Sequence, residues 1–251
     1  MPFLTRWDDD HSRPKFTSAL RDVLVRAVLP AVAIFVAIVG FGLLLTGPLD
    51  SFSKWENGIS TSLEDGRTET WNTVTKFMSM IGNTEYVIAV GVIVCAIVWW
   101  RTKEWWFAVV PLIAISLQAT VFVIAAAVVG RERPPVERLD PAPPTSSYPS
   151  GHVGASTALY VSFALMATRI SNVVVRRVVI VLCIVAPLLV SYARLYRGAH
   201  HVSDVVVGML NGLLCALLAW NYLRREPASG TASSDVETRG GSTGETAQTR
   251  A

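Results

Sequence analysis

The sequence predicts an all-α protein, a bundle of six transmembrane helices. Hydrophobic residues make up 51% of the 251 positions and charged residues only 16%, and the mean hydropathy of +0.43 is too high for an ordinary soluble domain. Six apolar segments recur along the chain, and a helix needs roughly 20 such residues to cross the hydrocarbon core of a bilayer. We therefore expect the bilayer to be the solvent of this chain.

Four of the segments are long enough to cross a bilayer unaided: 27–46, 105–130, 173–193 and 205–223. Segments 86–100 and 153–168 are short, and we expect polar flanks buried against protein to lengthen them. Between the first two spans, residues 48–85 mix apolar and charged residues at roughly helical spacing. This pattern predicts interfacial helices, with a packed loop over the site entrance as the alternative.

These segments define three parts: a cytoplasmic N-terminal segment at 1–26, the six-span domain at 27–224, and a tail at 225–251. The tail is rich in Gly, Ser, Thr and Ala, which bury too little apolar surface to offset the entropy of ordering, so we expect disorder. No small-residue cleavage signal follows the first apolar run, and we expect that span to remain in the mature protein. Gly208 and Gly212 have a small-residue spacing that favours packing within one bundle, and they leave the oligomeric state open.

Lysine and arginine in short loops set the orientation of a membrane protein. The segments expected inside contain Arg6, Arg13, Lys15, Arg21, Arg26, Arg101, Lys103, Arg169, Arg176, Arg177, Arg224 and Arg225. This bias predicts a multi-pass protein of the plasma membrane with both termini in the cytoplasm. The connections expected outside also contain arginines, and these need a function: Arg131, Arg133, Arg138, Arg194 and Arg197.

Several classes of partner are not expected. The basic residues form no stripe that would indicate nucleic acid, and we find no glycine-rich nucleotide loop of the usual kinds. The three cysteines lie inside apolar runs, where thiols behave as small buried hydrophobes, so we expect neither a disulfide nor a metal site. No cofactor is predicted.

Three polar clusters lie on the same expected side of the membrane, each at the end of a span: residues 130–134, 148–152 and 193–204. Any one cluster alone is better explained by interfacial arginines that extend toward water and histidines that cap helices. The convergence of all three indicates a single site on the extracytoplasmic side.

Together these clusters supply the groups that phosphate chemistry needs. Ser150 stands at an expected N-cap and Gly151 lets the backbone approach closely, so the helix that follows would present free N–H groups to an anion. Arg133 and Arg194 add planar guanidiniums that match phosphate oxygens. The sequence thus predicts a phosphate site.

Two histidines complete the predicted chemistry. His200 and Asp204 are four residues apart, so on a helix the carboxylate would accept the Nδ1–H and leave Nε2 free to attack phosphorus. His152 would protonate the leaving oxygen and later activate water. His201 should point elsewhere on that helix.

The clusters resemble the signatures of the phosphatidic acid phosphatase type 2 superfamily: Lys-x6-Arg-Pro, Pro-Ser-Gly-His and Ser-Arg-x5-His-x3-Asp. Arg133-Pro134 matches the end of the first signature, Pro149 to His152 the second, and Arg194, His200 and Asp204 the third. The resemblance implies a six-helix bundle and a metal-independent reaction. It also implies phosphate binding by Arg133, Ser150, Gly151 and Arg194, acid catalysis by His152, nucleophilic attack by His200, and orientation of His200 by Asp204.

The chain departs from these signatures at two positions. Ala126 stands where the family has its lysine, and Ala193 where it has the serine of the third signature. Arg131 is our first candidate to replace the lost phosphate-binding charge, and Arg197 the second. Loss of a charge-assisted contact without replacement costs about 1.5–3 kcal/mol, which slows an enzyme without abolishing its activity.

We therefore expect a phosphatase that releases inorganic phosphate from a lipid phosphate through a phosphohistidine intermediate. By resemblance, a prenyl pyrophosphate such as undecaprenyl diphosphate is the favoured substrate, followed by phosphatidic acid or phosphatidylglycerophosphate. A non-catalytic lipid-phosphate binder or transporter is the alternative, motivated by Ala126. A haloperoxidase-like oxidation is remote, because the soluble enzymes that share the signatures lack such spans.

Overall fold

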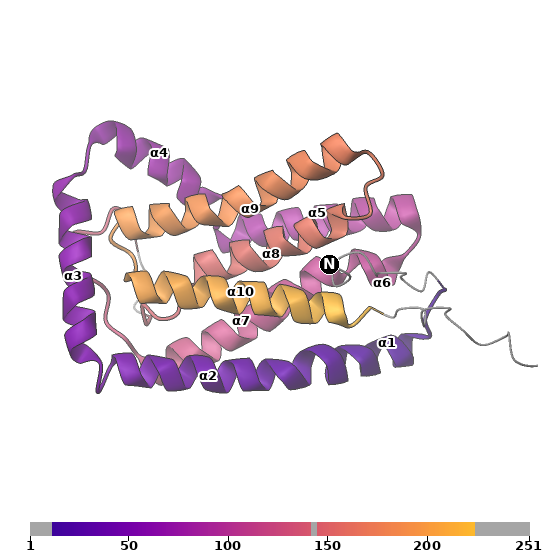
Figure 1. Ribbon diagram of the computed structural model, residues 1–251, viewed down its shortest axis with the longest axis horizontal. Coiled ribbons are helices and arrows are strands. Elements are labelled where there is room, and N and C mark those ends of the chain that lie inside the picture. Colours follow the sequence, from indigo (N-terminus) through magenta and orange to yellow (C-terminus); the bar gives the residue numbers. More distant parts are fainter. Residues whose placement is uncertain (1–11, 142–144, 224–251) are drawn as a thin grey trace, which may run out of the picture. The chain divides into compact units, whose positions relative to one another are not determined.

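The computed structural model describes residues 12–141 and 145–223, and within these residues every regular element is a helix (Figure 1). Residues 1–11 of the expected N-terminal segment and the expected tail at 225–251 lie outside this description. The elements follow one another as α1 (Phe16–Val23), η1 (Leu24–Val28), α2 (Leu29–Leu45), α3 (Asp50–Asp65), α4 (Glu69–Met80), α5 (Thr84–Thr102), α6 (Trp105–Ala108), α7 (Val110–Val129), α8 (Gly151–Ala167), α9 (Val173–Tyr196) and α10 (Val202–Asn221). The all-α prediction is confirmed.

The first span starts earlier than its apolar composition indicates. Helical backbone runs without a break from Phe16 to Leu45 through α1, η1 and α2, whereas the sequence predicted a start at Ala27. The π-helical turn η1 lies just before Pro30, a residue that lacks an N–H donor and crowds the carbonyl four residues earlier. A widened turn at this point relieves the crowding and lets the helix continue.

Among the described residues, five helical segments are long and apolar enough to cross a membrane: Phe16–Leu45, Thr84–Thr102, Trp105–Val129, Val173–Tyr196 and Val202–Asn221. The remaining expected span corresponds to α8, whose 17 residues rise about 26 Å at 1.5 Å per residue. α8 packs against α7, α9 and α10, and its polar residues Ser156, Thr157 and Ser162 are buried. Its sides therefore face protein, as expected for a short helix with polar positions.

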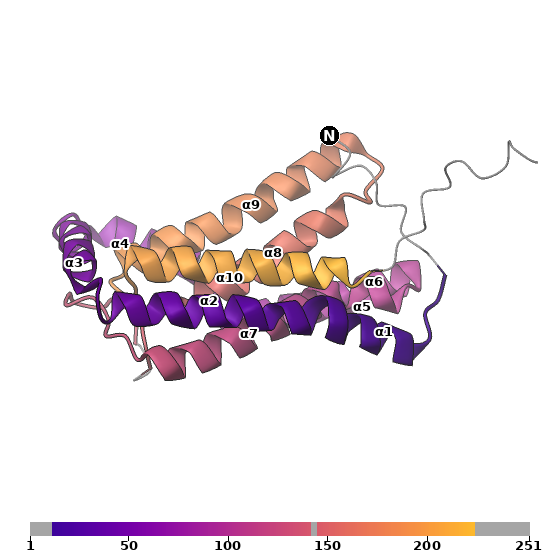
Figure 2. The ribbon, with the colours of Figure 1, turned by 60° about the horizontal axis from the view of Figure 1, so that its bottom comes forward.

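The segment between the first two spans forms two helices, α3 and α4. Both views show α3 running across the end of α2, roughly perpendicular to the long helices (Figures 1 and 2). α4 returns along α9, which it contacts. The Nη1 atom of Arg67, in the turn between α3 and α4, donates to the carbonyl oxygen of Glu137 at 2.8 Å, and its Nε donates to that of Tyr196 at 3.2 Å. These bonds attach the turn to the end of α9 and to the loop after α7.

Two glycines on α10 bring it against α8. A Cβ atom at Gly208 would lie 2.5 Å from the carbonyl oxygen of Ser150, and one at Gly212 would collide with that of Gly154. Only a residue without a side chain permits this approach of the two backbones. The small-residue spacing is therefore used within the chain, and it fixes the start of α8 against α10.

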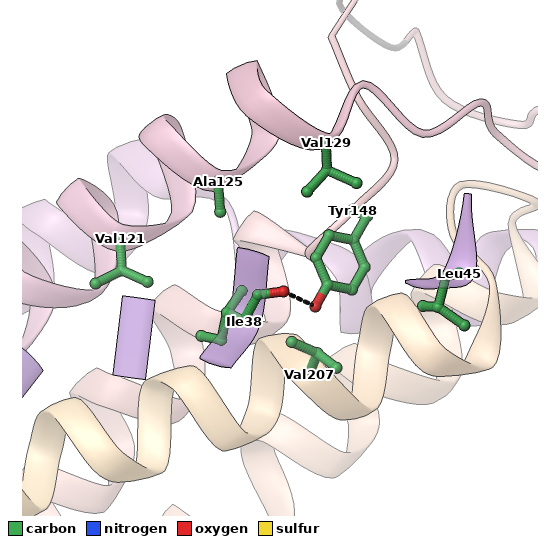
Figure 3. Close-up of a cluster of buried hydrophobic side chains, with 7 residues drawn as sticks. All are labelled: Ile38, Leu45, Val121, Ala125, Val129, Tyr148 and Val207. Atoms are coloured by element: carbon green, nitrogen blue, oxygen red, sulfur yellow. Dashed lines mark hydrogen bonds between the residues drawn. The ribbon is translucent and has the colours of Figure 1, made fainter. Parts of the chain in front are cut away.

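Tyr148 anchors the loop that leads into α8. Its ring is fully buried in a cluster formed by Ile38, Leu45, Val121, Ala125, Val129 and Val207, from α2, α7 and α10 (Figure 3). Its hydroxyl donates to the carbonyl oxygen of Ile38 at 2.7 Å. Because a buried hydroxyl without a partner is costly, this bond holds the loop in register two residues before Ser150.

Replacement of Tyr148 by Phe should lower the free energy of unfolding by about 1 kcal/mol, the net value of one hydrogen bond. This loss corresponds to a fall in melting temperature of about 2–4 °C. The measurement is thermal unfolding of the detergent-purified protein, with Tyr86→Phe as control, because Tyr86 is 49% exposed on α5. Equal melting temperatures for the two variants would show that the bond to Ile38 contributes nothing.

Candidate active site

A cavity of about 480 Å³ lies where α8 begins and α9 ends. It gathers residues from all three polar clusters, namely Arg133, Gly151, His152, Arg194 and His200. Its other walls come from α4, the start of α5, Phe122 of α7 and the loop between α7 and α8. The convergence expected from the sequence is therefore present for these five residues.

His200 is 4% exposed and is held by a backbone group. Its Nδ1 lies 2.7 Å from the carbonyl oxygen of Ser147. A carbonyl oxygen only accepts hydrogen bonds, so Nδ1 carries the proton and Nε2 keeps its lone pair. The tautomer is the one that nucleophilic attack through Nε2 requires.

The prediction of a hydrogen bond between His200 and Asp204 is wrong. His200 Nδ1 lies 4.0 Å from Asp204 Oδ2, beyond hydrogen-bond distance. The prediction assumed that both residues lie on one helix, but α10 begins at Val202 and His200 precedes it. The i to i+4 geometry therefore does not apply, and the Ser147 carbonyl occupies the position expected for the carboxylate.

Burial lowers the pKa of His200 well below its ordinary value, and the positive charges of Arg194 and Arg133 lower it further. The Asp204 charge and the bond to Ser147 oppose this shift and are outweighed. The imidazole is therefore neutral at physiological pH, which suits a nucleophile.

Asp204 organises the start of α10. Its Oδ2 accepts from the backbone N–H of His201 at 2.8 Å and lies 3.2 Å from His201 Nδ1, as part of a capping box. His201, to which we assigned no role, also has Nε2 3.0 Å from Asn57 Oδ1 on α3. It lines a second cavity, beside Asn57 and Arg131.

Arg131 turns away from the candidate active site and lies between two buried carboxylates. Its Nη1 donates to Asp204 Oδ1 at 2.6 Å and its Nη2 to Glu56 Oε2 at 2.8 Å. Glu56, on α3, also accepts from the backbone N–H of Ser203 at 2.6 Å. Both carboxylates are fully buried and Arg131 is 5% exposed. In this geometry the guanidinium neutralises protein carboxylates, whereas we expected it to bind phosphate.

Arg194 and Arg197 share one carboxylate. Asp140 accepts from Arg194 Nη1 at 2.9 Å and from Arg197 Nε and Nη2 at 2.7 and 2.6 Å. Burial alone would raise the pKa of Asp140, but the hydrogen bond from Arg197 and the charges of both arginines lower it overall. Arg194 Nη1 also donates to Ser79 Oγ on α4 at 3.1 Å. Asp140 is thus an ionised partner that fixes both guanidiniums.

Three donors beside the cavity have no hydrogen-bond partner within residues 12–141 and 145–223. They are Arg133 Nε, Arg194 Nε and the Ser150 hydroxyl, all buried. Ser150 is the N-cap residue of α8, as expected, but its side chain makes no capping bond. A Cβ atom at Gly151 would lie 2.8 Å from the end of the Phe122 ring on α7, so a side chain at this position would displace that ring. Buried donors without partners are rare in proteins, and an acceptor-rich anion would satisfy them.

Ala126, at the position of the family lysine, lines a neighbouring cavity with Thr145 and Ser146, which also line the candidate active site. Lys76 lies in the wall formed by α4. Sequence reasoning missed Glu56, Asp140 and Ser79. Asp140 could have been found, because it is an acidic residue that closely follows the first polar cluster. Nothing near Glu56 or Ser79 in the sequence connects them to arginines more than 70 positions away.

Comparison with known proteins identifies the family of this region. Residues 105–227 match the model of the PAP2 superfamily. The chain carries a PAP2 superfamily domain. No curated protein matches it in sequence.

Two solved structures share the PAP2 membrane fold with this chain. One is described as the first transmembrane PAP2 type phosphatidylglycerolphosphate phosphatase from Bacillus subtilis; the TM-score is 0.68 at 21% identity, over 76% of this chain and 94% of that chain. The other is LpxE of Aquifex aeolicus, with a TM-score of 0.54 at 17% identity, over 66% of this chain and 94% of that chain. The similarity extends beyond residues 105–227.

Arg131→Ala should destabilise the PAP2 domain by about 3–5 kcal/mol, because it leaves Glu56 and Asp204 as unpaired buried carboxylates. Thermal unfolding in detergent measures this loss, and Arg138→Ala is the control, since Arg138 lies exposed in the same loop. A stable Arg131→Ala variant would contradict the structural role of this arginine.

Proposed function

We propose that this protein is a metal-independent lipid phosphatase that hydrolyses a lipid phosphate or diphosphate through a phosphohistidine. The observation that carries the proposal is one cavity in which a neutral, buried imidazole lies with two guanidiniums that retain unused donors. The two structural neighbours are a phosphatidylglycerolphosphate phosphatase and LpxE, which supports phosphatase activity on a lipid. We favour a prenyl diphosphate such as undecaprenyl diphosphate, with phosphatidic acid and phosphatidylglycerophosphate as alternatives.

In the proposed reaction, the lone pair on His200 Nε2 attacks phosphorus and the bond from phosphorus to the leaving oxygen breaks. Arg133, Arg194, Ser150 and the N-terminus of α8 stabilise the charge on the phosphoryl oxygens. His152, in the first turn of α8, gives its proton to the leaving oxygen. It then takes a proton from water, whose oxygen attacks the phosphohistidine and breaks the P–N bond. Inorganic phosphate leaves and both imidazoles return to their starting states.

Asp204 takes an indirect part in this reaction. Its carboxylate fixes the start of α10 through the backbone N–H of His201, and His200 directly precedes that residue. Its charge also opposes the fall in the pKa of His200. We therefore assign Asp204 a positioning role, and the Ser147 carbonyl the orientation of the ring.

We further propose six spans, with α8 as the fourth, and place α3 and α4 at the outer membrane surface. Both helices are amphipathic and short of apolar residues compared with the spans, as interfacial helices are. The active site then opens on the extracytoplasmic side of the plasma membrane, and both termini lie in the cytoplasm. A lipid substrate could keep its tail in the bilayer during the reaction.

Detergent-purified protein should release phosphate from a lipid phosphate in the presence of a chelator, and His200→Ala should reduce this release to background. The nucleophile forms the covalent intermediate, so the substitution removes the reaction path itself. A phosphate assay measures the release, and thermal unfolding checks that the variant is folded. The Arg138→Ala protein provides a matched control.

Equal turnover by folded His200→Ala would overturn the mechanism. Ala126 suggests a second candidate function, a non-catalytic binder of lipid phosphate. Such a protein would bind the lipid, and neither the wild type nor His200→Ala would release phosphate.

The ordinary pKa of an imidazole is about 6.5. We expect the fall of kcat/KM on the acidic side of the pH profile to lie below this value. Attack requires neutral His200, and its lowered pKa means that more acid is needed to protonate it. Activity should therefore persist as pH falls through 6.5 and disappear only at lower pH. A pH profile of phosphate release tests this expectation, and a limb centred above 6.5 would contradict it.

A further inference from the structure

Besides the guanidiniums of Arg133 and Arg194, the candidate active site contains the ammonium group of Lys76. It lies on α4, lines the same cavity as Arg133 and Arg194, and is exposed. Within the described part of the chain it forms no hydrogen bond or ion pair. Arg194, by contrast, is 5% exposed and bonded to Asp140 and Ser79. The ammonium of Lys76 is therefore available to a ligand at the open end of the cavity.

The cavity has basic groups at two depths. Arg194 and His200 are buried and form its inner end. Lys76 lies one helical turn before Ser79, the residue that contacts Arg194, so both side chains project from one face of α4. Met80, Asn83 and Thr84 continue this wall toward α5. An anion held by the arginines would leave room for a second anionic group beside Lys76.

Lys76 does not lie where the family has its lysine. Ala126 lies on α7 and lines the neighbouring cavity, whereas Lys76 comes from α4 on a different wall. Lys76 is also more exposed than the arginines around the inner end, so its charge acts where the lipid-linked part of a head group would lie. These differences point to a separate task for Lys76.

We propose that Lys76 binds the lipid-attached phosphate of a diphosphate substrate, while the arginines hold the terminal phosphoryl group. The proposal rests on the phosphatase function above and names the residue that favours diphosphates over monophosphates. When His200 Nε2 bonds to the terminal phosphorus, the bond to the bridging oxygen breaks and its electron pair stays on the departing lipid monophosphate. An ammonium beside that phosphate stabilises the charge it gains.

The test compares farnesyl diphosphate with farnesyl monophosphate, which share one tail and differ only in the head group. Lys76→Gln should lower kcat/KM for the diphosphate about tenfold, the lower end expected for a charge-assisted contact. It should change kcat/KM for the monophosphate less than about twofold. Lys76→Arg keeps the charge and should retain most of the diphosphate activity.

Lys54→Gln is the matched control, because Lys54 is an exposed lysine of α3 that pairs with Asp50 at 2.7 Å. It should leave both rates unchanged. Equal losses on both substrates in Lys76→Gln would overturn the proposal, since Lys76 would then bind the transferred phosphoryl group in place of the family lysine. No loss on either substrate would overturn it as well.

A binding measurement separates this inference from the phosphatase proposal. A farnesyl methylenediphosphonate cannot be hydrolysed at its P–C–P linkage, and its effect on the melting temperature reports binding alone. Lys76→Gln should weaken this stabilisation, and the corresponding monophosphonate should stabilise both proteins equally. If wild-type protein cleaves neither farnesyl phosphate, the phosphatase proposal fails. Equal binding of the diphosphonate by wild type and Lys76→Gln would refute the role of Lys76.

Discussion

The ion pairs of Arg131 with Glu56 and Asp204 determine how the end of the helix bundle is built. Two fully buried carboxylates flank one buried guanidinium, at 2.8 and 2.6 Å. Buried charges are stable only when they are paired and their remaining hydrogen-bonding positions are filled. Here the N–H groups of His201 and Ser203 fill two of these positions. The positive end of the α10 dipole offsets the remaining negative charge. α3, α10 and the loop after α7 are thereby joined at one point.

This network sets the position of the proposed nucleophile without touching it. Residues 198–201 are confined between the end of α9 and the capped start of α10, and Gly198 adopts a φ of +70°, which a residue with a side chain rarely adopts. His200 lies in this short connection, and the Ser147 carbonyl determines its tautomer. Ser147 is in turn next to Tyr148, whose ring is fixed among α2, α7 and α10. The orientation of one imidazole thus depends on packing across most of the bundle.

Much of this arrangement was predictable from the sequence. Apolar runs located the helices, and the three signatures located the five residues that meet in one cavity, because both signals are local. The absence of a hydrogen bond between His200 and Asp204 was not predictable, since it depends on whether α10 begins before or after His200. The capping box of His201 and Asp204 is a start signal, but histidine is not a preferred N-cap residue and the signal was missed.

Ion pairs between residues far apart in the sequence set a second limit on what could be predicted. Arg131 and Arg133 are two residues apart and chemically equivalent in the sequence, yet one lies between protein carboxylates and the other lines the cavity. What separates them is Glu56, which is 75 positions from Arg131 and belongs to a helix whose sequence shows only amphipathic character. No property of the 131–133 segment itself contains this information.

The directions of three helices explain why this end of the bundle favours an anion. α8 and α10 begin here and present positive dipole ends, while α9 ends here and presents a negative one. Arg194 in the last turn of α9 and Arg197 just beyond it offset that negative end, and Asp140 neutralises one of their two charges. The cavity therefore keeps a net positive potential from Arg133, Arg194 and the start of α8, although its wall contains a carboxylate. That carboxylate holds Arg194 and Arg197 in place. The unused Nε donors of Arg133 and Arg194 remain available to an incoming oxyanion.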